Sequence, residues 1–223
     1  LSAPAWLGTD QLAFQRLRAE GGCTVGDDLW HIRNIELACD AGHFTIDGRM
    51  AWQPGQESSF LRRLLASAAS ADLRVDGQID LARLSQIVPA TLRIRAGTAI
   101  ERGMLEAQVE GHADGPRRVW SARLKTSDLA VLSDGRRVTW EEPWAVHLDA
   151  ALGAQGWEIQ NLDCQSSFLQ LSGSGTSSSG TARLACDLGR TVAELCQIFD
   201  LGTLQAAGRM DSQLRWDRTD GAD

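Results

Sequence analysis

The chain lacks several residue patterns that mark common classes of protein. It contains no tyrosine, no CxxC pair among its five cysteines, and no HxH, HExxH or HxxxH spacing among its four histidines. No apolar run approaches the roughly 20 residues that cross a bilayer, and the first residues lack a charged stretch followed by an apolar core. We therefore expect no membrane-spanning helix or signal peptide within these residues, and any membrane anchor of a parent protein lies outside them.

Positive charge is neither abundant nor clustered. The 22 basic residues are outnumbered by 29 acidic ones, which gives a net charge of -7. The densest basic pairs, Arg62–Arg63, Arg117–Arg118 and Arg136–Arg137, are scattered along the chain rather than gathered into a stripe. A protein that binds nucleic acid needs such a stripe to neutralise phosphates, so we expect no nucleic-acid partner.

Groups suited to metal binding or catalysis are isolated in the sequence. Cys186 lies in the alternating run "ARLACDL", which suits a small buried side chain better than a metal ligand. A disulfide between two of the cysteines is the alternative if the protein lies in an oxidising compartment. Glu141 and Glu142 are adjacent and so point to opposite faces of a strand. The loop "GSGTSSSG" is not followed by the lysine with which phosphate-binding loops contact a nucleotide, so it does not predict a nucleotide site. We expect no metal, no cofactor and no catalytic residue, with an enzyme on a β-rich scaffold as the least favoured alternative.

The dominant pattern is an alternation of apolar and polar residues. "WAVHLDA" and "GMLEAQVEG" each place apolar side chains on one side of a strand and polar ones on the other. Gly, Asp and Asn punctuate these runs at turns that join antiparallel neighbours. The pattern predicts a mainly β antiparallel meander with strands over residues 29–39, 42–52, 72–80, 91–95, 99–112, 117–126, 137–151, 156–164, 167–174, 180–187 and 203–217.

Helical spacing occurs only in short segments. We predict helices over Thr9–Glu20, residues 57–70, Asp80–Pro89 and Arg190–Phe199, each about three turns or fewer. Helices of this length are marginal alone, so they must pack on the apolar face of the sheet.

The chain contains two copies of one supersecondary unit. "WHIRNIELACDAGHFTIDG" begins at Trp30 and "WEIQNLDCQSSFLQLSG" at Trp157, and both carry a Cys nine residues before a Gly. "DLARL" from Asp80 is answered by "DLGRT" from Asp187. Repeated units of this kind stack to bury a shared apolar surface. The repeat predicts that Trp30 and Trp157 occupy equivalent positions, and that Cys39 and Cys164 do likewise.

These landmarks divide the chain into three parts. Residues 1–28 form an N-terminal helix and lead-in, residues 29–128 form a first β repeat with the helical insertion 57–70, and residues 129–223 form a second β repeat.

Large aromatic residues are frequent, with eight Trp and five Phe. They are either core anchors of the sheet or the lining of an apolar groove that is open to a ligand. The candidates for such a groove are Trp30, Val109, Trp144, Val146, Leu148, Trp157, Ile159, Leu171 and Leu184.

The segment Asp76–Gly111, "DGQIDLARLSQIVPATLRIRAGTAIERGMLEAQVEG", resembles the repeat of AsmA-like and TamB-like envelope proteins. In that family a strand enters a short "DLxxL" helix, leaves through a Pro and returns through Gly-bearing strands. The second copy, "SGTARLACDLGRTVAELCQIFDLGTLQAAGRMDSQLRW", keeps this order without the Pro. "VWSARLKTSDL", residues 119–129, is similar to the family's strand that ends in "DL". The resemblance covers about 60% of the chain by this alignment of repeats.

The resemblance implies a repeating β-groove, in which long curved antiparallel strands form a sheet that is apolar inside and polar outside. It also implies a function: a periplasm-facing segment of a membrane-anchored parent protein that binds or conducts phospholipid, or another acyl-chain lipid, in biogenesis of the cell envelope. The alternative is a structural or protein-binding β-repeat module with a closed core. Coverage of Val109, Val146, Leu148, Ile159, Leu171 and Leu184 by the helices would favour that alternative.

Overall fold

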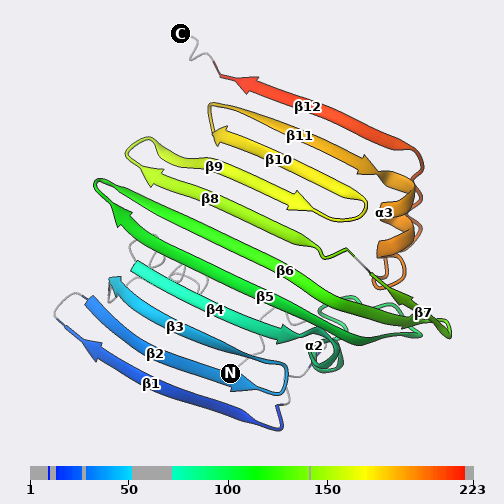
Figure 1. The fold of residues 1–223 in the computed structure, drawn as a ribbon, viewed down its shortest axis with the longest axis horizontal. Coiled ribbons are helices and arrows are strands. Elements are labelled where there is room, and N and C mark those ends of the chain that lie inside the picture. The colour runs from blue at the N-terminus through cyan, green and yellow to red at the C-terminus, as the bar shows by residue number, and fades with distance from the viewer. Residues whose placement is uncertain (1–9, 11–13, 27–28, 52–71, 141, 219–223) are drawn as a thin grey trace.

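The computed structural model describes residues 10, 14–26, 29–51, 72–140 and 142–218. They form one antiparallel twelve-stranded sheet in which the strands follow one another in sequence order, except that β7 pairs with the end of β6 (Figure 1). The predicted mainly β meander is therefore confirmed. Two short helices lie at one end of the sheet, and β1 and β12 lie at its opposite edges (Figure 1).

The strands range from four to seventeen residues. They are β1 (Leu17–Val25), β2 (Leu29–Cys39), β3 (Gly42–Ala51), β4 (Asp72–Asp80), β5 (Thr98–Asp114), β6 (Arg117–Ser133), β7 (Arg136–Thr139), β8 (Ala145–Gly153), β9 (Gly156–Gln165), β10 (Leu169–Thr176), β11 (Ser179–Asp187) and β12 (Arg209–Asp217). The helices are α2 (Leu81–Ile87) and α3 (Leu188–Leu195).

The pairing collects the apolar side chains on one side of the sheet. Residues directly opposite each other in an antiparallel pair point to the same side. One row across the strands is Ala107, Leu124, Val146, Cys164, Leu171 and Leu184. The next row, on the other side, is Gln108, Arg123, His147, Asp163, Ser172 and Arg183. We call the first side the apolar face and the second the polar face.

The two hairpins that carry the repeated Trp contain the same bulge. In each hairpin the first strand contributes two residues where the second contributes one, and Asn34 or Asn161 is one of the two. The pairs that flank the bulge are Ile32–Gly48 and Ile35–Ile46 in the first copy, and Ile159–Gly175 and Leu162–Gly173 in the second. Trp30 and Trp157 each stand two residues before the first of these pairs, so the two Trp occupy equivalent positions.

The same register corrects the predicted equivalence of the two cysteines. Cys39 ends β2 opposite Gly42, next to the hairpin turn. Cys164 lies opposite Leu171, two residues farther from the turn of its own hairpin and nearer the bulge. The counterpart of Cys164 in the first copy is therefore Leu37. The spacing to a following glycine was misleading because β10 contains two glycines two residues apart, and the bulge uses the second. A shift of two residues still leaves both cysteines on the apolar face.

Each copy leads from a strand into a short helix that an aspartate caps. The side chain of Asp80 accepts a hydrogen bond from the Arg83 backbone N at 3.0 Å, and Asp187 accepts one from the Arg190 N at 2.9 Å. Such a cap satisfies a backbone donor that has no partner within the first turn. The predicted helices after Asp80 and Asp187 are thereby confirmed, although both end earlier than expected.

The segments that follow the two helices meet each other. Ile94 and Phe199 form an isolated antiparallel bridge. Arg95 N donates to Ile198 O at 2.9 Å, and Asp200 N donates to Arg93 O at 2.9 Å. This bridge ties the two copies together across the end of the sheet.

The fully buried core lies at this helical end. It consists of Ile100, Leu129, Val131, Trp140 and Ile198, with Leu81 and Phe199 packed against it. Trp140 Nε1 donates to Glu194 Oε2 of α3 at 2.7 Å. On the apolar face, Cys186 Sγ lies 3.2 Å from Thr191 Oγ1 of the same helix. The short helices therefore close one end of the apolar face.

The predicted N-terminal helix is wrong where the structure describes it, because Leu17–Glu20 begin β1. Leu17 and Ala19 lie opposite Cys39 and Leu37 on the apolar face, which is a period of two rather than 3.6. The free edge of β2 supplies a backbone ladder and apolar partners, and a short isolated helix has neither.

Several strand boundaries also differ from the prediction. Residues 91–95 form turns around the Ile94 bridge, and residues 203–208 precede β12. The predicted strand 137–151 is interrupted between β7 and β8, where Pro143 has no N–H to donate to a ladder. The division placed at residues 128–129 lies inside β6. The helical insertion 57–70 lies outside the described residues.

Three glycines on the apolar face leave room for aromatic rings of the neighbouring strand. Each glycine is the direct cross-strand partner of a ring, and a Cβ atom in its place would lie 2.2 to 2.5 Å from that ring. The pairs are Gly77–Phe44, Gly111–Trp120 and Gly180–Trp216. The rings therefore lie across the glycines, close to the sheet.

Replacing Gly111 with Ala should destabilise the fold by about 1–3 kcal/mol, the usual cost of forcing extra volume into a packed contact. The new Cβ would lie 2.3 Å from Trp120 Cζ3, so the ring would have to move. Gly153→Ala is the matched control, since its Cβ would meet Arg117 Cγ at an ordinary 3.7 Å. Urea unfolding of both variants checks this, and equal midpoints would contradict it.

Candidate functional site

The apolar face collects most of the groove residues that the sequence singled out. Val146, Leu171 and Leu184 lie in one cross-strand row. Val109 and Leu148 share the next row, on either side of Ala122. The remaining positions on this face are Ile159, opposite Ala150, Trp157, opposite Leu152, and Trp30, opposite Met50.

Trp144 differs from the other candidates because it lies at the closed end. Its ring meets the buried Phe168 edge-to-face, with centroids 5.9 Å apart and an interplanar angle of 86°. Its backbone N donates to Thr126 Oγ1 at 2.9 Å. Trp144 therefore belongs to the packing that supports the helical end, which is the core-anchor interpretation of the tryptophans.

Away from the helices most of the apolar face is open among the described residues, with Ala150 as a buried position at 5% exposure. Leu124 and Ile159 are each 39% exposed and Trp157 is 52% exposed, whereas Val131 in the helical-end core is fully buried. Val109, Val146, Leu148, Leu171 and Leu184 are half-buried, and none of them belongs to the buried class. Neighbouring side chains on the sheet shield them in part, and α2 and α3 do not bury them.

Sequence reasoning missed further residues on this face. Trp120, Ala122, Leu124 and Leu162 lie in the same rows as the predicted set. Leu214 of the edge strand β12, opposite Ala182, extends the row of Val109 and Leu148 and is 60% exposed. Strands β2, β3 and β4 add Leu37, Ile35, Ile46, Phe44 and Val75. Alternation within each strand carried the signal, but only the pairing register joins the strands into one surface.

The polar face is covered by charged and hydrogen-bonding side chains. Arg74 of β4 forms ion pairs with Asp76 of the same strand at 2.7 Å and with Glu110 of β5 at 3.0 Å. These groups are largely exposed, and pairs of this kind contribute little to stability. Their consequence is a strongly solvated surface opposite the apolar one.

One polar cluster contains groups that enzymes use. His147 Nε2 lies 3.1 Å from Asp149 Oδ1, and Asn161 Nδ2 lies 3.5 Å from His147 Nδ1. Asp149 also accepts a hydrogen bond from Ser121. The carboxylate, rather than the imidazole, thus receives the serine hydroxyl. A Ser-His-Asp triad needs the opposite order, with the imidazole between the other two groups.

The environment of Asp149 changes its acidity. Burial by itself raises the pKa of this carboxyl. Hydrogen bonds from Ser121 and Asn161 and the interaction with His147 outweigh burial, so the pKa lies below its ordinary value. The cluster is therefore a hydrogen-bond network that links β6, β8 and β9.

The five cysteines are all free thiols. Cys23, Cys39, Cys164 and Cys186 face the apolar side by their register, and Cys23 is exposed. Burial, followed by the nearby charge of Asp163, raises the pKa of the Cys164 thiol. Within the part of the chain that the structure describes, no group of three His, Cys, Asp or Glu residues could hold a metal ion.

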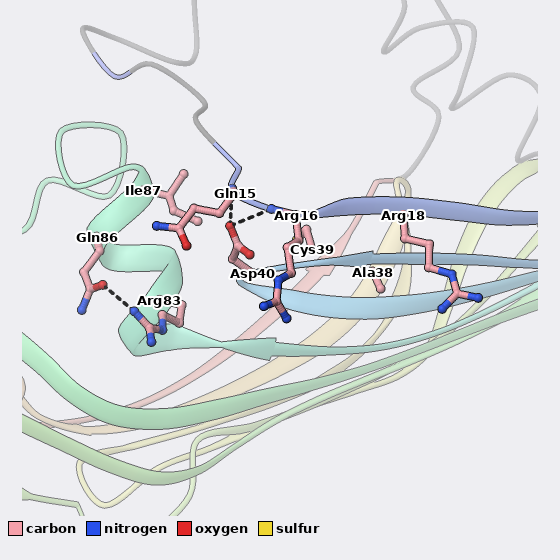
Figure 2. Close-up of a pocket in the computed structure, with 9 residues that line it drawn as sticks. All are labelled: Gln15, Arg16, Arg18, Ala38, Cys39, Asp40, Arg83, Gln86 and Ile87. Atoms are coloured by element: carbon pink, nitrogen blue, oxygen red, sulfur yellow. Dashed lines mark hydrogen bonds between the residues drawn. The ribbon is translucent and has the colours of Figure 1, made fainter.

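A cavity of about 720 Å³ opens at the helical end, between β1, β2 and α2 (Figure 2). It is lined by Gln15, Arg16, Arg18, Ala38, Cys39, Asp40, Arg83, Gln86 and Ile87. Asp40 accepts a hydrogen bond from the Arg16 backbone N at 3.3 Å, and Arg83 donates to Gln86 at 3.4 Å (Figure 2). Arg18 is already paired with Glu20 at 2.6 Å, so Arg16 and Arg83 are the arginines that make this cavity suited to an anionic group.

We expect Asp149→Asn to lower the free energy of unfolding near neutral pH, and this loss should shrink as the pH falls below the ordinary pKa of an aspartate, about 3.9. A carboxylate whose pKa is depressed by folding stabilises the protein above its unfolded pKa. That contribution is lost as pH falls through the folded pKa, because both states are then protonated. Urea unfolding across the acidic range measures the effect, and a difference that does not change with pH would refute it.

Comparison with known proteins leaves the chain without an established relative. No family model, no curated protein and no solved structure matches it. No helix among the described residues is long and apolar enough to cross a membrane. The apolar face and the cavity beside it are the features of the chain that indicate a function.

Proposed function

We propose that the chain binds phospholipid, or another acyl-chain lipid, along the apolar face. In this proposal it is a non-enzymatic, periplasm-facing segment of an AsmA-like protein that binds or conducts lipid during envelope biogenesis, and its parent is membrane-anchored outside these residues. The exposure of the apolar face away from α2 and α3 is the observation that carries the proposal. Wide exposed apolar surfaces are uncommon on soluble domains and mark binding surfaces.

Acyl chains suit this surface because it is broad and has few polar groups. Leu124, Val146 and Cys164 are consecutive members of one row, so a flexible hydrocarbon chain can lie across several strands without leaving a polar atom unsatisfied. Burial of each CH₂ group contributes about 0.8 kcal/mol. A ligand with long chains therefore gains affinity from area alone, without a specific pocket.

The cavity at the helical end supplies a place for a headgroup. Arg16 and Arg83 line it together with Cys39 of the apolar face and Ile87 of α2, whereas Arg18, opposite Ala38, lies on the polar face and pairs with Glu20. Guanidinium groups bind phosphate through charge-assisted hydrogen bonds. This arrangement favours an anionic amphiphile whose phosphate lies in the cavity while its chains lie on the apolar face.

The family assignment rests on the resemblance of the sequence together with the local structure of its motif. In both copies a strand runs directly into a helix at an Asp-Leu pair, Asp80-Leu81 and Asp187-Leu188. The second candidate, a structural or protein-binding module, draws support from the closed core at the helical end. Among the residues that the structure describes, that core covers one end of the apolar face.

Val109→Glu and Val146→Glu should each abolish copurification of phospholipid, because a carboxylate in the middle of the apolar face repels acyl chains. Both side chains are half-buried and within reach of water, so the melting temperature should fall by only a few degrees, the shift expected for about 1–2 kcal/mol. Native mass spectrometry of the purified chain measures bound lipid, and thermal unfolding measures stability.

Gln108→Glu is the matched control, since it adds the same charge to the same strand on the polar face and should leave lipid binding unchanged. Unfolding of both valine variants, or absence of bound lipid from the unmodified chain, would contradict the proposal and favour the closed module. Equal loss of lipid in Gln108→Glu would show a general charge effect and would also count against it.

A further inference from the structure

The free edge of β12 carries a sequence that is complementary to itself when it is read in the opposite direction. The strand is "RMDSQLRWD", Arg209–Asp217, with Gln213 at its centre. A twofold axis at Gln213 would place each residue opposite a residue of a second copy. The facing pairs would be Arg209–Asp217, Asp211–Arg215 and Gln213–Gln213 on the polar face, and Met210–Trp216 and Ser212–Leu214 on the apolar face.

The backbone of β12 is oriented to make this pairing. Leu188 N donates to Gly208 O at 2.9 Å, and Arg218 N donates to Ser178 O at 2.7 Å. The even-numbered residues therefore direct their backbone groups inward, toward β11. In a regular antiparallel strand the odd-numbered residues then direct theirs outward. Gln213 and the charged residues consequently present free backbone donors and acceptors along the edge, and a twofold axis can pass through a hydrogen-bonded Gln213–Gln213 pair.

The edge is also long, regular and exposed. All nine residues of β12 pair with β11 without a register shift. Arg209 and Asp211 have side-chain exposures of 89% and 67%, and Leu214 is 60% exposed. Edges of this kind pair readily with another strand unless a bulge, a proline or an unpaired charge blocks them. Here the charges alternate in sign so that they match rather than oppose a second copy.

The opposite edge of the sheet lacks this arrangement. The register shift between Glu20 and Gly22 comes from the extra residue of the β2 bulge at Asn34, and Gly21 opposite that bulge has a φ of 141°. Strand β1 also lacks the alternating charges of β12, and the adjacent glycines Gly21 and Gly22 weaken the interior of the strand. The two edges are not equivalent, so pairing at β12 alone gives a closed dimer rather than a filament.

We propose that the chain forms a twofold symmetric dimer through antiparallel pairing of β12 with β12 of a second copy. The dimer would join two sheets into one continuous sheet and would extend the apolar face across the junction, where Met210 and Trp216 of the two copies meet. This inference depends on the edge strand alone and holds whether or not the apolar face binds lipid.

Charge reversal at the edge tests the dimer. Asp211→Arg places two arginines opposite each other, and Arg215→Asp places two aspartates opposite each other. Each variant should raise the dissociation constant of the dimer about tenfold or more, since like charges directly opposite across strands are destabilising. The double variant Asp211→Arg/Arg215→Asp should restore the dimer. An equimolar mixture of the two single variants should also form a dimer, because each charge then faces its opposite. Sedimentation velocity over a wide range of concentration measures each state.

Gln213→Pro provides a second test that does not rely on charge. Its backbone N–H points away from β11, so proline can be accommodated in the edge strand while it removes an outward donor. This variant should be monomeric with an unfolding midpoint close to that of the parent. The proposal would be overturned if the unmodified chain stays monomeric at every concentration. It would also be overturned if the single charge variants dimerise like the unmodified chain. Oligomers that grow without limit would also overturn it, since they indicate pairing of β1 with β12.

Discussion

The register of the antiparallel ladder is the constraint on which the remaining features of this protein depend. Each strand alternates apolar and polar residues, so a slip of one residue between neighbours would move a whole set of apolar side chains to the solvated side. The two equivalent bulges at Asn34 and Asn161 each add one residue, yet the pairs on both sides of the bulge stay on the same face. One continuous apolar face from β1 to β12 exists because the ladder keeps this register throughout.

A sheet with one apolar face normally needs a second layer, and here the second layer is incomplete in the described residues. The helices α2 and α3 and the Ile94–Phe199 bridge bury a compact core around Val131 at one end. Beyond that core the apolar side chains shield one another only in part. The cross-strand glycine–aromatic pairs contribute to this shielding, because each ring lies across a neighbouring strand. The fold thus combines a closed end, which supplies stability, with an open surface, which is available for binding.

The electrostatic design follows the same division. Charged residues are gathered on the polar face and at the strand edges, where ion pairs such as Arg74–Glu110 are solvated. Few charges interrupt the apolar face, and the arginines that line the cavity lie beside it, at the helical end. A ligand with one anionic end and a long apolar body matches this separation of charge from hydrocarbon, and that match links the cavity to the open face in the proposed function.

The sequence determines those features of this protein that act between near neighbours in the chain, and the tertiary structure determines those that depend on distant contacts. Period-two alternation, turn residues and the Asp caps at Asp80 and Asp187 act between near neighbours, so the strands, their meander order and both helices after those caps followed from the sequence. The strand identity of Leu17–Glu20 depended on the distant edge of β2, and the break between β7 and β8 depended on where Pro143 meets the ladder. The same holds for the equivalence of Cys164 with Leu37, since a bulge decides it. The exposure of Leu124 and Trp157 depends entirely on the tertiary structure, because only the packed fold determines which part of an apolar face its few short helices can cover.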